Sequence, residues 1–238
     1  MQQEAESHSS PLFPRWRAFE QTKLYDFLAA TPMIVWYSLS IANMVPLFAH
    51  ELAQTGGASL ELRAVISLLS RGAVIVFIGL ALVLLAVRRP PKAKAKGLVP
   101  RISAFAGTFL VVAVVWLPQQ PIGLAVSLVS LALIFGGLCF SIFALVHLGR
   151  SFSLMPEARR LVTNGPYAFV RHPLYLGEAI STLGMMLQYL SPFAIVIVAL
   201  QLGFQLQRMR NEEDVLGSLF PEYADYRLHT ARLVPGLY

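Results

Sequence analysis

The chain has 238 residues, of which 56% are hydrophobic and only 13% are charged. Because a soluble domain carries about 25% charged residues, this composition argues against a soluble globular protein, as does the mean hydropathy of +0.61. Disorder is excluded as well, since the chain has ample apolar surface to bury. The remaining class is an integral membrane protein with several spans.

The formal net charge is +6. In a membrane protein this excess is best interpreted as topology, because Lys and Arg favour the cytoplasmic loops, and no nucleic-acid partner is expected. The single cysteine, Cys139, cannot form an internal disulfide, and the sequence has neither a CxxC nor an HExxH spacing. No metal site is therefore predicted.

The apolar stretches predict the membrane spans, at roughly 20 residues each. Four of them cover residues 25–48, 65–87, 102–117 and 122–147. The next stretch, residues 175–206, is too long for one helix, and Pro192 splits it because proline disfavours helical geometry in the residue before it. We expect an all-α polytopic protein with about six transmembrane helices, the last two forming a tight C-terminal hairpin.

The predicted spans divide the chain into three parts. Residues 1–24 form a cytoplasmic N-terminal segment, residues 25–147 a four-helix transmembrane region, and residues 148–238 a C-terminal core of loop, hairpin and cytoplasmic helix. Of the 19 Lys and Arg residues, 17 fall on one side of the six predicted spans, and only Arg63 and Arg71 lie toward the other. This asymmetry predicts that both termini are cytoplasmic, and we expect a bacterial inner membrane.

Polar and aromatic residues are dense in residues 161–178, just before the predicted hairpin. Gly165-Pro166 is a turn dipeptide, and Pro173 fits the first turn of a helix. A rigid loop of this kind would present Tyr167, Arg171, His172 and Tyr175 at the membrane surface, where they could bind a small charged ligand. The alternative is an interfacial anchor, because Tyr and Arg commonly lie at headgroup depth.

A second polar cluster begins where the last predicted helix leaves the membrane. Arg208 and Glu212 are four residues apart and share one helical face, and Glu213 and Asp214 follow directly. An ordinary solvated helix with ion pairs is the alternative. However, a hairpin would bring Arg208 and His172 to the same membrane face, which favours one functional site.

These residues form a pattern that resembles a known superfamily. The chain reads Gly165-Pro166-Tyr167, three residues, Arg171-His172-Pro173, then Tyr175 and Gly177. After the hairpin come Arg208, Glu212, Glu213, Leu216, Phe220, Tyr223 and Tyr226. The pattern is similar to that of the isoprenylcysteine carboxyl methyltransferase and phospholipid methyltransferase superfamily, over about residues 148–235.

The resemblance implies a membrane methyltransferase that uses S-adenosyl-L-methionine. It places Arg208, Glu212 and Glu213 in catalysis, with Arg208 facing the methyl acceptor. The cofactor-binding residues it implies are Arg159, Arg160, Leu161, Val162, Tyr167, His172, Pro173, Leu174, Tyr175 and Glu212. The chain departs from the prenylcysteine enzymes at Phe152 and near Arg159, where those enzymes have a polar residue and a histidine.

The residue types also suit methyl transfer when they are considered without the family resemblance. A sulfonium favours aromatic faces such as those of Tyr167 and Tyr175, and methyl transfer depends mostly on positioning. The acceptor is expected to be a lipophilic or small amphiphilic molecule that arrives from the membrane lipids. If it is a carboxylate, Arg208 would hold it; if it is an amine or a thiol, Glu213 is the expected base.

The sequence is also consistent with a second class of membrane enzyme. Steroid and sterol reductases share a similar membrane hairpin, and Leu176-Gly177-Glu178 also resembles their pattern. That resemblance implies an NADPH-dependent membrane reductase. The spacing of Glu212 and Glu213 and the stretch before Tyr167 favour the methyltransferases. The oligomeric state is not indicated by the sequence.

Overall fold

The computed structural model describes residues 22–55 and 62–236 of the chain. Most of the predicted N-terminal segment lies outside the described residues. The long helices are α2 (Lys23–Thr55), α3 (Leu62–Val87), α4 (Val99–Phe109), α5 (Leu124–Leu148), α6 (Pro173–Gln188) and α7 (Pro192–Leu219). The shorter elements are η1 (Leu110–Trp116), η2 (Gly149–Ser151), η3 (Gly165–Ala168), α8 (Tyr223–His229), β1 (Ala93–Lys94) and β2 (Glu157–Ala158).

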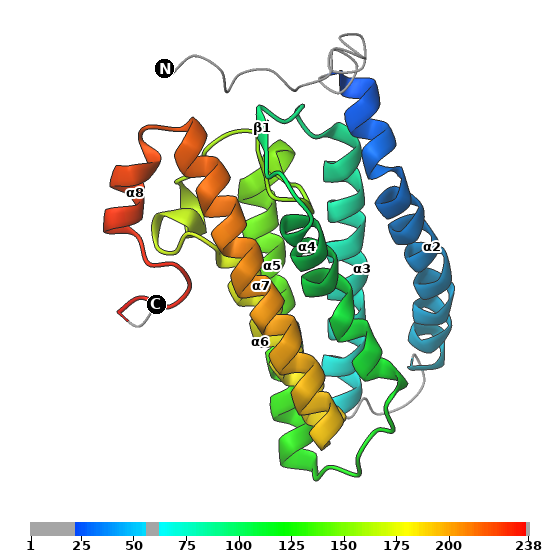
Figure 1. The fold of residues 1–238 in the computed structure, drawn as a ribbon. Helices are drawn as coiled ribbons and strands as arrows, with labels where there is room; N and C mark the ends of the chain where they lie inside the picture. Colours follow the sequence, from blue (N-terminus) through cyan, green and yellow to red (C-terminus); the bar gives the residue numbers. More distant parts are fainter. Residues whose placement is uncertain (1–21, 56–61, 237–238) are drawn as a thin grey trace, which may run out of the picture.

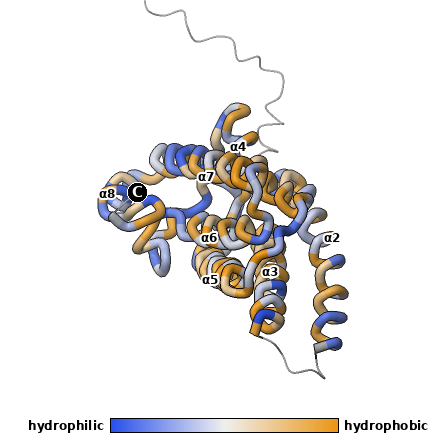
Figure 2. Tube along the Cα trace, turned by 90° about the horizontal axis from the view of Figure 1, so that it is seen from below, coloured by the Kyte–Doolittle hydropathy of each residue, from blue (hydrophilic) through white to orange (hydrophobic). Residues whose placement is uncertain are grey.

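The prediction of an all-α polytopic membrane protein is confirmed. Within the described residues, 5 helical segments are long and apolar enough to cross a membrane, and Figure 2 shows most of the bundle coloured as hydrophobic. The predicted fifth span corresponds to α6, which has only 16 residues. The third span changes from α4 to the 3-10 segment η1, in a run of valines whose β-branched side chains are restricted in an α-helix.

Helix α2 passes through Pro32 and Pro46 without a break. Both prolines lie within the span that the sequence predicted over residues 25–48, although proline disfavours a helix interior. In a membrane bundle, neighbouring side chains and local adjustments can satisfy the backbone carbonyls that a proline leaves free. Tertiary surroundings therefore override the local preference here.

Helices α6 and α7 follow one another through a short turn but pack mainly on other partners, α6 on α5 and α7 on α4. Small residues explain the close approach of α6 to α5. A side chain at Gly177 would collide with Ser141 Oγ and approach the carbonyl oxygen of Gly137 to 2.7 Å. Ser130 Oγ also donates to the carbonyl oxygen of Gly184 at 2.7 Å. The predicted tight hairpin is thus a looser connection between two separately packed helices.

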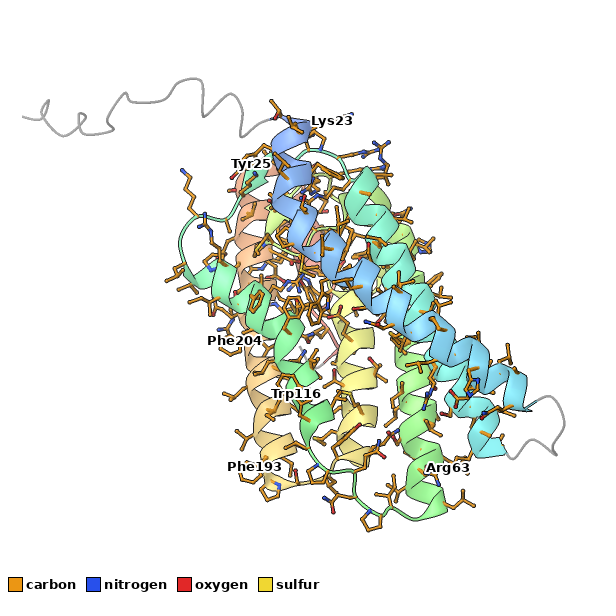
Figure 3. The ribbon with its side chains drawn as sticks, turned by 90° about the vertical axis from the view of Figure 1, so that its right-hand side faces the viewer. Lys23, Tyr25, Arg63, Trp116, Phe193 and Phe204 are labelled. Carbon is orange, nitrogen blue, oxygen red and sulfur yellow. The ribbon has the colours of Figure 1, made fainter. Side chains whose placement is uncertain are left out.

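The polar loops gather at one end of the bundle. The strand β1, the turn before α6 and the helix α8 all lie at the upper end in Figure 1. Lys23 lies at this end and Arg63 at the opposite end (Figure 3). Strand β1 pairs antiparallel with β2, which places Lys94 opposite Glu157 and joins the basic loop to the segment after α5.

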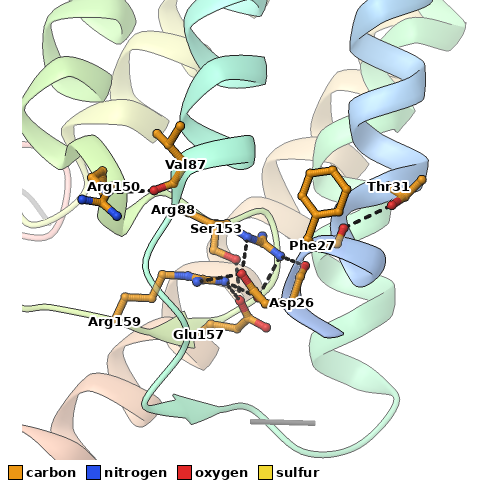
Figure 4. A network of polar contacts seen from close by, with 9 residues as sticks. All are labelled: Asp26, Phe27, Thr31, Val87, Arg88, Arg150, Ser153, Glu157 and Arg159. Atoms are coloured by element: carbon orange, nitrogen blue, oxygen red, sulfur yellow. Dashed lines mark hydrogen bonds and ion pairs between the residues drawn. The ribbon is translucent and has the colours of Figure 1, made fainter. Parts of the chain in front are cut away.

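A buried ion network anchors the start of α2 to this polar end (Figure 4). Asp26 accepts hydrogen bonds from Arg88 at 2.8 and 2.9 Å and from Arg159 at 2.9 and 3.2 Å. Arg159 also donates to Glu157 at 2.6 Å, and Glu157 accepts from the Ser153 hydroxyl at 2.8 Å. One carboxylate therefore ties α2, the end of α3 and the segment after α5 together.

Candidate active site

A pocket with about 780 Å³ of empty space opens at the polar end of the bundle. It lies between the segment after α5, the turn η3, the start of α6, the end of α7 and helix α8. The predicted residues that line it are Arg159, Arg160, Leu161, Val162, Tyr167, His172, Leu174, Tyr175, Arg208 and Glu212. Pro173 and Glu213 are not among the lining residues.

The turn before α6 has the rigid form that the sequence predicted. Gly165 adopts φ +62, where a side chain would be strained and would also collide with the ring of His147. The backbone amides of Arg171 and His172 donate to the carbonyl oxygens of Ala231 at 2.8 Å and Arg232 at 3.1 Å. These bonds join the turn to the C-terminal segment and fix the position of His172.

Arg208 lines the pocket and is only 4% exposed. Its guanidinium covers the ring of Tyr175, 4.9 Å from the centroid, and donates to Thr108 Oγ1 at 3.1 Å. A further bond reaches the carbonyl oxygen of Ser153 at 3.3 Å. No sequence pattern pointed to Thr108 or Ser153, because they are 100 and 55 residues away from Arg208 along the chain.

Glu212 connects the other polar groups of the pocket. Its Oε1 accepts a short hydrogen bond from the Tyr175 hydroxyl and lies 3.4 Å from Arg208 Nε. Its Oε2 lies 4.0 Å from His172 Nδ1. The Glu212 side chain is 22% exposed, so it can accept further hydrogen bonds from a ligand.

Glu213 has a different environment, although it is the next residue. Its carboxylate accepts from Arg171 Nε at 3.0 Å and from Arg232 Nη2 at 2.7 Å, and it lies 3.2 Å from His172 Nε2. Successive residues on a helix point about 100° apart, so the two carboxylates face opposite sides of His172. Glu213 fixes the turn and the C-terminal segment in place, whereas Glu212 faces the pocket.

The two arginines that were predicted to bind the cofactor, Arg159 and Arg160, lie in different surroundings. The Arg159 guanidinium is buried in the network with Asp26 and Glu157, so its charge is already paired within the protein. Arg160 is exposed and lines the pocket. Of the two, Arg160 is the one whose charge can reach an anionic group of a ligand.

Three tyrosines close the pocket on the side of α8. The Tyr226 hydroxyl donates to the Tyr167 carbonyl oxygen at 2.6 Å. Burial raises the pKa of Tyr226 to about 12 and raises the pKa of Tyr167 and Tyr223 even further, so all three phenols stay neutral. Tyr223 is 3% exposed, and its hydroxyl has no hydrogen-bond partner within residues 22–55 and 62–236. A polar ligand could supply that partner.

A second cavity, with about 1070 Å³ of empty space, lies on the membrane side of Arg208. Its lining residues come from α2, α3, α4, η1, α5, α6 and α7. Thr108, which accepts the hydrogen bond from Arg208, lines this cavity, while Arg208 itself lines the first pocket. The guanidinium of Arg208 thus marks the boundary between a polar pocket and an intramembrane cavity.

The match to a known family concerns the part of the chain that forms the pocket. Residues 128–218 match the model of the isoprenylcysteine carboxyl methyltransferase (ICMT) family. This range includes η3, α6 and nearly all of α7, and with them His172, Tyr175, Arg208 and Glu212. The match therefore covers the part of the chain that forms most of the pocket.

Three relatives illustrate the range of similar proteins. The cobalt-zinc-cadmium resistance protein CzcN of Cupriavidus metallidurans is 38% identical over 32% of this chain and 36% of its own length. Protein-S-isoprenylcysteine O-methyltransferase of Dictyostelium discoideum is 31% identical over 46% of this chain and 48% of its own. The enzyme of the same name from Schizosaccharomyces pombe is 36% identical over 39% and 42%. The chain thus spans about a third to a half of the length of these relatives.

Proposed function

We propose that the chain is a member of the isoprenylcysteine carboxyl methyltransferase family, whose model matches residues 128–218, and that it transfers a methyl group from S-adenosyl-L-methionine to a lipophilic acceptor. The observation that carries this proposal is the position of Arg208 between the polar pocket and the intramembrane cavity. A cofactor that enters from the aqueous side and an acceptor that enters from the bilayer would meet at this residue.

The pocket residues fit the groups of the cofactor. S-adenosyl-L-methionine supplies an electrophilic methyl group on a cationic sulfonium. The faces of the pocket tyrosines can attract this cation, and Glu212 can accept hydrogen bonds from its amino group or ribose hydroxyls. Arg160 and His172 are candidate donors for its carboxylate, and the unpaired Tyr223 hydroxyl fits one further polar atom. No covalent chemistry by the protein is required, so its role is orientation and exclusion of water.

The first prediction tests cofactor binding. His172→Ala and Tyr223→Phe should each weaken the binding of S-adenosylhomocysteine by about 1–3 kcal/mol, the usual cost of an unpaired buried polar group. Isothermal titration calorimetry measures the affinity, and His229→Ala, a histidine whose side chain is 74% exposed, is the matched control. Tyr223→Phe removes no hydrogen bond within the described part of the protein, so its fold should be unchanged. Unaltered affinity in both variants would refute the pocket assignment.

The same titration separates the two enzyme classes. A methyltransferase should bind S-adenosylhomocysteine and show no saturable heat with NADPH. The opposite result would favour a reductase of the steroid and sterol type. We use the product rather than the substrate as the probe because it cannot turn over during the measurement.

The second prediction concerns topology. Both termini and the basic loop around β1 should face the cytoplasm, because nearly all of the Lys and Arg residues lie at that end. In a Cys139→Ser background, Lys96→Cys should resist a membrane-impermeant thiol reagent in intact cells, whereas Arg63→Cys should react. Both positions are exposed. Labelling at position 96 but not at position 63 would reverse the orientation.

A further inference from the structure

The intramembrane cavity is lined by polar side chains as well as apolar ones, although it lies among the membrane-spanning helices. Trp36 and Val112, which line it, are 48% and 37% exposed, so the cavity borders the bilayer and an apolar chain from the membrane could occupy it. Polar side chains in the membrane are costly unless they are paired. The partners of each polar group therefore indicate which kind of molecule fits the cavity.

The polar groups of the cavity nearest to Arg208 are already paired. Thr108 accepts a hydrogen bond from Arg208, and Glu178 Oε2 accepts one from Gln205 Nε2 at 2.9 Å. The buried guanidinium of Arg208 also acts electrostatically on the Glu178 carboxylate, so this carboxylate requires no cation from a ligand. Arg208 uses only two of its five N–H groups in hydrogen bonds to Thr108 and Ser153. The others remain for the head group of an acceptor.

One helical turn deeper, α6 and α7 bring a second polar pair to the cavity. The two helices run antiparallel because a short turn joins them, and they meet where Glu178 contacts Gln205. One helical turn from this contact toward the connection, the same faces carry Thr182 on α6 and Gln201 on α7. Both residues line the cavity, and they are only 7% and 2% exposed.

This second pair includes a hydrogen-bond acceptor without a donor. The Gln201 amide nitrogen donates to the Gly107 carbonyl oxygen at 3.0 Å, which leaves the amide oxygen as an acceptor. That oxygen has no partner in the described part of the chain, and neither has the hydroxyl of Ser141, which lines the same cavity from α5. A buried polar atom without a partner destabilises the protein. The cavity therefore favours a ligand that supplies a donor at this depth.

A hydroxyl group fits Gln201 and Thr182 together, because it can donate to the amide oxygen and accept from the threonine hydroxyl. An ammonium fits less well, since Arg208 already balances Glu178 and an additional charge within the membrane is costly. We infer that the methyl acceptor is a lipophilic molecule that carries a hydroxyl along its chain, bound by Gln201 and Thr182. This inference rests on the proposed function and narrows its class of acceptor.

Helix α7 sets the distance between this hydroxyl and the methylated end of the acceptor. Gln201 and Arg208 are seven residues apart on one face of α7, which corresponds to roughly 10 Å along the helix axis. An extended chain advances roughly 1.2 Å per bond, so the hydroxyl should lie about eight or nine bonds from the group that Arg208 holds. A pure hydrocarbon chain would leave the Gln201 oxygen without a partner.

The test compares decanoate with 10-hydroxydecanoate, which adds a hydroxyl at this distance from a carboxylate. Calorimetry on the full-length protein in lipid nanodiscs, corrected with empty nanodiscs, gives the ratio of the two affinities. In Gln201→Met, which keeps the length of the side chain, this ratio should shift toward decanoate by about fivefold, the order expected for one net hydrogen bond. Thr182→Val should shift it in the same direction. Gln54→Met, at an exposed position on α2, should keep the wild-type ratio.

A change in the probe tests the same contact without a substitution. 10-Methoxydecanoate has an oxygen at the same position but cannot donate a hydrogen bond. After correction for partition into empty nanodiscs, the wild-type protein should bind it about fivefold more weakly than 10-hydroxydecanoate. This comparison decides the question if neither substituted protein folds.

An affinity ratio that is the same in the wild-type protein, Gln201→Met and Thr182→Val would overturn the inference, as would failure of the wild-type protein to bind 10-hydroxydecanoate. Affinity for S-adenosylhomocysteine should stay within about twofold in both variants, as expected for sites that do not share partners. This control shows that the fold and the cofactor pocket are intact. Loss of S-adenosylhomocysteine binding by the wild-type protein would instead refute the proposed function.

Discussion

Replacement of Arg208 by alanine should reduce methyl transfer by at least about 100-fold, the magnitude seen when one preorganised electrostatic group is removed from an active site. The affinity for S-adenosylhomocysteine should change by less than about 1 kcal/mol, below the loss expected for a directly bound buried polar group. The reason is the position of Arg208 on the membrane side of the pocket, where it bonds Thr108. Transfer of tritiated methyl groups to a total membrane lipid extract measures turnover, and calorimetry measures binding.

Two further variants make this result interpretable. Arg210→Ala removes an exposed arginine from the same helix and should leave both quantities unchanged. Arg208→Lys keeps the charge but loses the planar fork that reaches Thr108 and Ser153, so it should restore little turnover.

A structural role for Arg208 would give a different pattern. Arg208 Nε lies 3.4 Å from Glu212 Oε1, so the two residues could instead form an ion pair that only stabilises the fold. In that case Arg208→Ala and Glu212→Ala would lose thermal stability and cofactor affinity together. Strong coupling between them in a double-mutant cycle, without a separate turnover defect, would contradict the assignment of Arg208 to the acceptor.

Replacement of Asp26 by alanine should destabilise the protein by about 3–5 kcal/mol, because it leaves Arg88 buried without its counter-charge and Arg159 paired with Glu157 alone. The side chains of Asp26, Arg88 and Arg159 are only 6%, 7% and 0% exposed. Asp26→Asn keeps one accepting oxygen and should cost less. Chemical unfolding in detergent, followed by circular dichroism, measures the loss.

Asp214→Ala is the matched control for Asp26→Ala, since Asp214 is exposed on α7. The Asp26 variant should also weaken S-adenosylhomocysteine binding, because Arg159 is adjacent in sequence to the pocket residues Arg160, Leu161 and Val162. A variant with unchanged stability would mean that the network of Figure 4 is not a structural anchor.

The hydropathy and charge of the sequence were sufficient to predict the membrane-spanning architecture. A run of apolar residues must be helical in the bilayer, where every backbone polar group has to be satisfied within its own segment. The same local logic predicted the turn at Gly165 and the shared face of Arg208 and Glu212. These features depend on residues that are close together in the chain.

The partners of the polar groups could not be predicted in this way. Asp26 meets Arg159 across 133 residues, and the neighbouring acids Glu212 and Glu213 have identical side chains but face different surroundings. The sequence placed Glu178 only in a motif, and the structure puts it in an intramembrane cavity with Gln201.

The sequence by itself therefore determined which segments are helical and apolar, together with the motif that carries the family resemblance. Only the tertiary structure decided which carboxylate faces the pocket, which is held by arginines and which lines the intramembrane cavity. The physical reason is that the helical period and hydropathy act over a few residues. Ion pairing and burial instead depend on which helices pack together, and here α6 packs on α5 and α7 on α4.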